Sequence, residues 1–232
     1  MKHIITIMLL ISMSYGTTSA QKSARLFNGK NFKNWYAYSP STGKTKGEKL
    51  FEIRDSAIVM QGSRPGYLMT KKSFANYRLS VDFKWDEQHK GKRNSGVMYH
   101  VATSQPDSLW PQGIQYQIKD NATGDFILLR GTTLTVNDIT NPPAPNAVHK
   151  RTADAEKTIG EWNTLVIEVR GDRCDQYLNG TLVNSGTGAS QNHGRILLQF
   201  EGAPVWFKNI ILTPLMPHKT AKPQSDCSPH AV

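Results

Sequence analysis

Cysteine is scarce in this 232-residue chain, which has only Cys174 and Cys227. Two cysteines are too few for a thiolate metal cage, and these two are too far apart in sequence to form a CxxC redox pair. In an exported protein they could form one disulfide that ties the C-terminal tail to the body, or they could remain two unpaired thiols. The sequence alone leaves both alternatives open.

A long hydrophobic run is also lacking. The longest apolar stretch, residues 4–13, is far shorter than the roughly 20 residues that a helical membrane span needs. It follows a basic start and precedes small residues that end at Ala20, a combination typical of a secretory signal peptide. We therefore predict a signal peptide over residues 1–20, export to the periplasm or the medium, and no membrane span.

Acidic residues are outnumbered, with 18 Asp and Glu against 28 Lys and Arg, which gives a formal net charge of +10. Such a balance permits contact with acidic polymers or membrane surfaces. The basic residues are scattered through presumed turns, as at Lys44, Lys71 and Lys90, and do not form a stripe. We interpret them as a solvated surface and expect no nucleic-acid partner.

Motifs for cofactors are missing as well. No glycine-rich phosphate loop and no nucleophile elbow occurs, and the seven histidines show no metal-ligand spacing. We therefore predict no cofactor and no metal in the site. A structural calcium ion stays open, because loop oxygens that bind calcium leave little trace in a sequence.

Short stretches of alternating apolar and polar residues dominate the chain. The alternation is clear in residues 79–86, 93–100, 113–120 and 196–201, and turn signals such as Asn179-Gly180 separate the strands. Successive side chains of a strand point to opposite faces, so each strand can bury one face and expose the other. Many short strands without a long helix predict an all-β fold, an antiparallel two-sheet jelly-roll sandwich.

We assign this fold to one domain over residues 24–215, followed by a polar C-terminal tail over residues 216–232. If the four alternating strands lie side by side, their polar faces meet in one floor. This predicted floor contains Lys84, His100, Gln115, Gln117, Gln199 and Glu201. Amide side chains both donate and accept hydrogen bonds, which suits sugar hydroxyls and equally suits a solvated sheet face.

Two residues beside the floor are further candidates. Trp110 lies in a loop between Pro106 and Pro111, where it could stack on a sugar ring or cover the core. Asp120 ends the predicted strand 113–120, where it marks either a strand end or part of the site.

Eight segments, in their order and spacing, resemble the 3-keto-disaccharide hydrolase domain family. They are LFNGKNFKNW (26–35), GYLMT (66–70), YRLSVDFKW (77–85), NSGVMYH (94–100), GIQYQIKD (113–120), GEWN (160–163), YLNG (177–180) and LLQFEGAPVWFKNIIL (197–212). The resemblance covers nearly all of residues 24–215. It implies a concanavalin A-like jelly roll that cleaves sugars whose 3-hydroxyl has been oxidised to a ketone.

Three positions depart from the family pattern. Arginine is common where His100 stands, glutamate where Gln115 stands, and histidine where Glu201 stands. All three belong to the predicted floor, so the departures predict a different substrate or a loss of activity.

The resemblance also implies a mechanism. A ketone acidifies the neighbouring C–H bond, and loss of that proton gives an enolate that expels the glycosidic oxygen, after which water addition completes a hydrolysis. In this interpretation His100 or Glu201 is the base, and Lys84 stabilises the enolate oxygen. Glu201 or Asp120 protonates the leaving sugar. A two-carboxylate glycosidase, pairing Glu201 with Asp120 or Asp82, is the rival mechanism. A lectin-like carbohydrate-binding module on the same fold is the alternative function.

Overall fold

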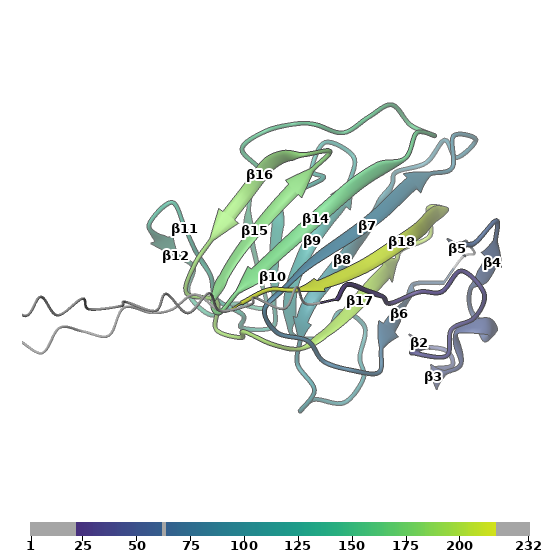
Figure 1. Ribbon diagram of the computed structural model, residues 1–232, viewed down its shortest axis with the longest axis horizontal. Coiled ribbons are helices and arrows are strands. Elements are labelled where there is room, and N and C mark those ends of the chain that lie inside the picture. Colours follow the sequence, from purple (N-terminus) through teal and green to yellow (C-terminus); the bar gives the residue numbers. More distant parts are fainter. Residues whose placement is uncertain (1–21, 62–63, 217–232) are drawn as a thin grey trace, which may run out of the picture.

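A computed structural model describes residues 22–61 and 64–216. The predicted signal peptide, Cys227 and nearly all of the predicted tail lie outside these residues. About half of these residues lie in strands, and the only helix among them is one short 3-10 helix, η1 (Gly47–Lys49). Two large antiparallel sheets, A and B, pack face to face (Figure 1), which confirms the predicted two-sheet sandwich. A two-stranded pair, β11 (Thr135–Val136) and β12 (Ile139–Thr140), lies apart from both.

Sheet A has the strand order β16-β15-β14-β7-β18-β5-β4, with β1 beside β18. Its strands are β1 (Ala24–Arg25), β4 (Glu52–Arg54), β5 (Ala57–Met60), β7 (Tyr77–Trp85), β14 (Asn163–Arg170), β15 (Arg173–Leu178), β16 (Thr181–Gly186) and β18 (Val205–Pro214).

Sheet B has the order β13-β10-β9-β8-β17-β6-β2-β3. Its strands are β2 (Trp35–Ser39), β3 (Gly43–Thr45), β6 (Gly66–Thr70), β8 (Asn94–Val101), β9 (Gly113–Lys119), β10 (Phe126–Leu129), β13 (Asn146–His149) and β17 (Arg195–Phe200).

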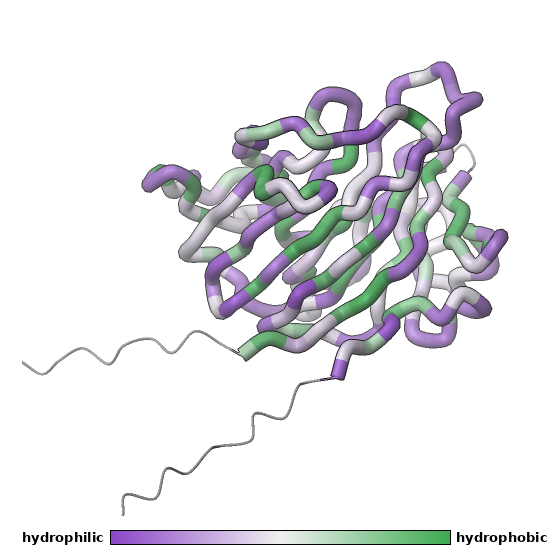
Figure 2. Tube along the Cα trace, turned by 45° about the horizontal axis from the view of Figure 1, so that its top comes forward, coloured by the Kyte–Doolittle hydropathy of each residue, from purple (hydrophilic) through white to green (hydrophobic). Residues whose placement is uncertain are grey.

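The main core lies between the sheets and follows the alternation of the sequence. Along β7 every second residue from Tyr77 to Trp85 is buried, and the intervening residues are partly or fully exposed. Figure 2 shows hydrophobic and hydrophilic residues alternating along the strands, while several loops at the strand ends are mostly hydrophilic. Burial of these apolar side chains supplies the main driving force for the sandwich. Cys174 on β15 belongs to this core. Because Cys227 lies outside the described residues, the disulfide and the two unpaired thiols both stay open.

The prediction that residues 79–86 share a sheet with the other three alternating strands is wrong. Strand β7 pairs with β14 and β18 in sheet A, whereas β9, β8 and β17 are adjacent in sheet B. Alternation shows which face of a strand is buried. It does not show to which sheet the strand belongs, because both sheets of a sandwich bury one apolar face.

Candidate functional site

The outer face of sheet B carries polar side chains in consecutive rows. In one row Gln117 on β9 lies opposite Gly96 on β8, which lies opposite Gln199 on β17. The next residues along the strands place Lys119 opposite Asn94, and Glu201 comes directly after the end of β17. The register therefore gathers polar side chains from three strands on one face.

These side chains line a pocket, here called the amide pocket. Its polar lining is Asn94, Gln115, Gln117, Lys119, Asn146, Gln199 and Glu201, and Trp110 with apolar side chains of β10 and β13 completes it. Gly96 sits in the middle of the lining without a side chain. A Cβ atom there would lie 2.8 Å from atoms of the Gln115 side chain, so the amide of Gln115 lies across Gly96.

The amides of the pocket form a directed chain of hydrogen bonds. Gln115 Nε2 donates to Gln117 Oε1, and Gln117 Nε2 donates to Asn94 Oδ1 at 3.1 Å. Asn94 Nδ2 in turn donates to Glu201 Oε2. Each amide donates toward the carboxylate, and a charged acceptor strengthens the last bond. The chain therefore fixes the orientation of three amides relative to Glu201.

Glu201 is the carboxylate at the end of this chain, and it is half-buried. Burial raises the pKa of its side chain above the ordinary value, and the positive charge of Lys119 opposes the shift. A carboxylate with a raised pKa is a stronger base once ionised, so Glu201 is suited to accept a proton from a bound ligand.

Gln199 offers an unused acceptor to the same pocket. Its side chain is only 3% exposed, and its Oε1 atom has no donor among the described residues. A buried acceptor without a partner is costly, and native structures contain few of them. A ligand hydroxyl that donates to Oε1 would satisfy it.

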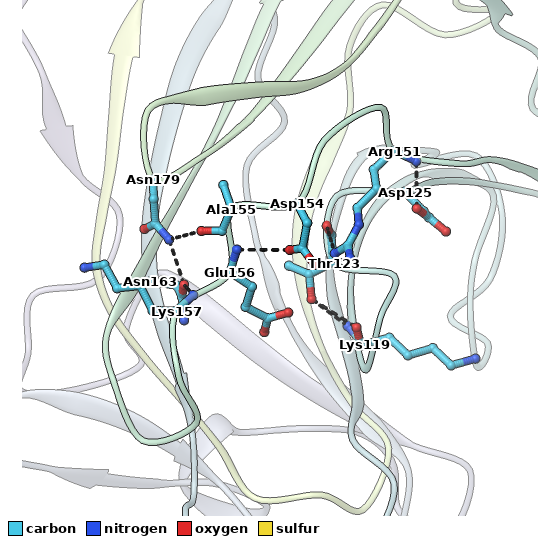
Figure 3. Close-up of polar contacts among 10 residues, drawn as sticks. All are labelled: Lys119, Thr123, Asp125, Arg151, Asp154, Ala155, Glu156, Lys157, Asn163 and Asn179. Atoms are coloured by element: carbon cyan, nitrogen blue, oxygen red, sulfur yellow. Dashed lines mark hydrogen bonds and ion pairs between the residues drawn. The ribbon is translucent and has the colours of Figure 1, made fainter.

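Lys119 is held at the end of β9 by the turn that follows, as Figure 3 shows. Its backbone N–H contacts Thr123 Oγ1 at 3.2 Å, and Arg151 donates to the Thr123 carbonyl at 3.0 Å. The Arg151 backbone also donates to Asp125 Oδ1 at 2.8 Å. Arg151 belongs to the segment that follows β13. Farther along this segment, the Ala155 carbonyl accepts a hydrogen bond at 2.7 Å from Asn179 Nδ2, which lies on the turn after β15. This segment therefore ties the turn beside the pocket to sheet A.

Lys84 does not lie in the pocket, so its predicted place on the floor is wrong. It lies on the outer face of sheet A, where its ammonium nitrogen is 5.2 Å from the ring centre of Trp162 and 4.9 Å from that of Trp206. The error follows directly from the assignment of β7 to the wrong sheet.

His100 is likewise absent from the pocket. It has a left-handed backbone, with φ of 52°, and the pairing of β8 with β17 shifts register beside it. This bulge turns the side chain inward, where its ring packs edge-on against Tyr77 and Tyr99. The side chain is fully buried, and burial lowers its pKa to about 4. His100 is therefore a neutral residue of the core. The prediction that it lies on the polar floor, where it could act as the base, is wrong.

Asp120 does not line the pocket either. Its carboxylate accepts hydrogen bonds from the Arg93 backbone at 3.0 Å and from Arg93 Nε at 2.8 Å, and it forms an ion pair with the same guanidinium. The contact joins the start of β8 to the end of β9. Asp120 thus marks a strand end, one of its two predicted interpretations.

The remaining candidates of the sequence converge in the pocket, and several other lining residues, among them Asn94 and Lys119, were missed. Gln115, Gln117, Gln199, Glu201 and Trp110 all line the amide pocket. Asn94 and Lys119 were not predicted, although the alternation of their own strands places both on the polar face. No group of three or more His, Cys, Asp or Glu side chains suited to a metal occurs among residues 22–61 and 64–216. Nor is any helix in these ranges long and apolar enough to cross a membrane.

The fold and the pocket define a concanavalin-like jelly roll with a polar pocket on the outer face of one sheet. A family model described as the 3-keto-alpha-glucoside-1,2-lyase-like domain matches residues 22–213, so the chain belongs to that family. This confirms the resemblance seen in the sequence. No curated protein matches the chain.

Solved structures share the fold at low identity. A putative glycosyl hydrolase from Parabacteroides distasonis is 22% identical, with a TM-score of 0.61 over 83% of this chain and 94% of that one. The carbohydrate-binding module CBM66 from Bacillus subtilis is 14% identical, with a TM-score of 0.53 over 76% and 93%. A beta-glucanase from Bacillus licheniformis is 13% identical, with a TM-score of 0.51 over 85% and 99%.

Proposed function

We propose that this protein cleaves 3-keto-glycosides by elimination, with Glu201 as the base. The observation that carries the proposal is the half-buried Glu201 carboxylate, which ends a chain of oriented amides in a pocket suited to sugar hydroxyls. The description of the family, which names a lyase of 3-keto-alpha-glucosides, supports the same class of reaction.

The proposed reaction begins at the C2–H bond of the sugar, which the ketone at C3 acidifies. Glu201 takes the C2 proton, and the electron pair of that bond forms an enolate. The enolate then forms the C1=C2 double bond as the C1–O bond breaks, and protonated Glu201 gives its proton to the departing oxygen, which leaves Glu201 ionised to activate water. Water that adds across C1=C2 restores hydrogen at C2 and places a hydroxyl on C1, so the net result is hydrolysis. Lys119, the cation that lines the pocket, takes the enolate-stabilising role first given to Lys84.

The rival two-carboxylate mechanism lacks its second carboxylate in this pocket. Among the described lining residues Glu201 alone carries one. Asp82 lies on sheet A, where it accepts hydrogen bonds from Thr164 and Asn209, and Asp120 binds Arg93. An acid and a base flanking one glycosidic bond would need both carboxylates within one pocket.

Turnover in heavy water separates the two mechanisms. Purified protein is incubated with 3-keto-trehalose in D₂O, and the released 3-keto-glucose is analysed by mass spectrometry and NMR. Elimination followed by water addition places deuterium on C2, or leaves an unsaturated 3-keto sugar that absorbs in the ultraviolet. Direct hydrolysis leaves the C2 hydrogen in place.

Matched variants then assign the base. Glu201→Gln keeps the shape of the side chain and should lower kcat by 100-fold or more, within the range typical of general base catalysis. Glu48→Gln, at an exposed position of η1, should leave kcat unchanged. Full activity in Glu201→Gln, or release of product without C2 exchange, would exclude the proposed reaction.

The alternative of a binding module remains the second candidate, since one structural neighbour is a carbohydrate-binding module. Sugar binding without turnover of any 3-keto-disaccharide would favour it. We further propose that the protein acts outside the cytoplasm, as its N-terminal sequence predicts. Cell fractionation with an antibody, together with N-terminal sequencing of the mature protein, tests this proposal.

A further inference from the structure

A loop crosses the outer face of sheet B beside the amide pocket. This loop, residues 102–112 between β8 and β9, is here called the strap. On this face lies a second apolar cluster, separate from the main core: Tyr36, Tyr67, Met69, Met98, Val101 and Leu197. These side chains are almost fully buried although they point away from the space between the sheets. The strap reaches across this cluster, because Asp107 contacts two of its tyrosines.

Asp107 anchors the strap to β2 and β6. Its Oδ1 atom accepts hydrogen bonds from Tyr36 Oη at 2.5 Å and from Tyr67 Oη at 2.9 Å, and its Oδ2 atom lies 3.7 Å from Lys44 Nζ. Burial, together with the Asp107 charge, raises the pKa of both tyrosines, so both hydroxyls remain donors. Arg195 supports this anchor, because it donates to Tyr36 Oη at 3.1 Å.

Arg130 anchors the other side of the strap to the end of β10. Its guanidinium donates to the carbonyl oxygen of Trp110 at 2.7 Å and to that of Leu109 at 3.1 Å. At this second anchor Trp110 has a left-handed backbone, with φ of 54°, which is strained for a bulky residue. Such strain persists where surrounding contacts enforce it, and it concentrates at functional sites.

We propose that Asp107 and Arg130 are positioning residues that hold Trp110 against the amide pocket, where its indole stacks on the bound sugar ring. The amides then bind the hydroxyls of the ring, and the indole covers its C–H face. This inference rests on the proposed function, and it adds that substrate binding depends on the strap as well as on the sheet. Neither anchor lines the amide pocket, so both act through Trp110.

Fluorine NMR tests the positioning directly. The chain has five tryptophans, so protein labelled with 5-fluorotryptophan should give five resonances, and loss of one in Trp110→Phe assigns Trp110. Asp107→Ala and Arg130→Gln should each shift or broaden that resonance and leave the other four in place. Asp172→Ala, an exposed aspartate on the β14–β15 turn, is the matched control and should change none. Added trehalose has no ketone to drive elimination; we expect it to bind in the amide pocket and to shift the Trp110 resonance in the wild type.

Kinetics with 3-keto-trehalose test the consequence. Asp107→Ala should raise KM at least about 10-fold while kcat stays within about twofold, the pattern expected when binding common to substrate and transition state is lost. If Asp107→Ala does not fold, the double variant Tyr36→Phe with Tyr67→Phe keeps both rings, removes both donors and should show the same pattern.

The two assays separate the failure of this inference from the failure of the proposed function. An unmoved Trp110 resonance in Asp107→Ala and Arg130→Gln overturns the positioning role, whatever the turnover. A moved resonance with an unchanged KM, or a trehalose titration that leaves the wild-type resonance unmoved, overturns the stacking role. If the wild type turns over no 3-keto-disaccharide, the proposed function fails, and the fluorine spectra still decide the role of the strap.

Discussion

The buried His100 makes the stability of this protein depend on pH in a defined range. Burial lowers the pKa of its ring in the folded state to about 4, whereas the unfolded value is close to 6.5. Both ring nitrogens lack a hydrogen-bond partner of good geometry, and the backbone of Gln191 offsets the effect of burial only in part. His193 is the charged group that lowers this pKa further.

The direction of the effect follows from proton binding. Below pH 6.5 the unfolded chain binds a proton at His100 that the folded protein does not bind until about pH 4, so acid favours unfolding. The contribution of the neutral His100 ring to the free energy of unfolding is fully present above pH 6.5 and is lost as the pH falls toward 4. The difference between the folded and unfolded pKa of His100 corresponds to a loss of about 3 kcal/mol in the free energy of unfolding by pH 4.

A His100→Phe variant isolates this contribution. Phenylalanine retains an aromatic ring between Tyr77 and Tyr99 but does not titrate. Urea denaturation, followed by tryptophan fluorescence at pH 7, 6, 5 and 4, gives the free energy of unfolding of both proteins. Other acid-sensitive groups contribute equally to both, so the wild type should lose about 3 kcal/mol more than the variant between pH 7 and pH 4. Parallel stability curves would show that His100 is not buried as described.

Three further substitutions test the placement of other residues. Lys84→Met should leave kcat and KM unchanged. It should lower the free energy of unfolding by about 0.5–1 kcal/mol, because it removes only cation–π contacts with Trp162 and Trp206. A large loss of kcat would show that Lys84 takes part in catalysis. Asp120→Asn should lower the free energy of unfolding, measured by urea denaturation, by about 1 kcal/mol, because it weakens the partly exposed ion pair with Arg93. A large loss of kcat without a loss of stability would contradict this expectation. Gly96→Ala should raise KM several-fold and lower the free energy of unfolding by about 1 kcal/mol, since its Cβ would displace the buried Gln115 amide from Gln117. An unchanged KM would show that the Gln115 amide does not bind substrate.

Much of the fold could be predicted because alternation reports burial directly. Strands β8, β9 and β17 were each predicted to within about a residue at either end, and their polar faces do meet. Strand pairing across the two sheets is a long-range property that alternation does not encode. For that reason β7 was found as a strand but assigned to the wrong sheet.

The errors at the site have local causes. A bulge adds one residue and reverses the facing of the side chain beyond it, so a strict count by two placed His100 on the wrong face. The anchors of the strap could not be predicted, because Asp107 and Arg130 contact residues far away in the sequence. The sequence did indicate an ordered loop there, through Pro106 and Pro111.

Gln199 offers a test of whether the amide pocket serves a ligand or the fold. Its neighbour on the same face of β17, Leu197, is buried in an apolar cluster, so an apolar side chain would suit the position structurally. The sequence instead places there an amide that is 3% exposed and whose Oε1 atom has no donor. Gln199→Met keeps the approximate volume and removes the unsatisfied acceptor, so it should raise the free energy of unfolding by about 1 kcal/mol. If a substrate hydroxyl is the missing donor, the same change should raise KM at least tenfold, and thermal unfolding with steady-state kinetics measures both effects. A less stable variant with an unchanged KM would mean that the amide serves the fold and not a ligand.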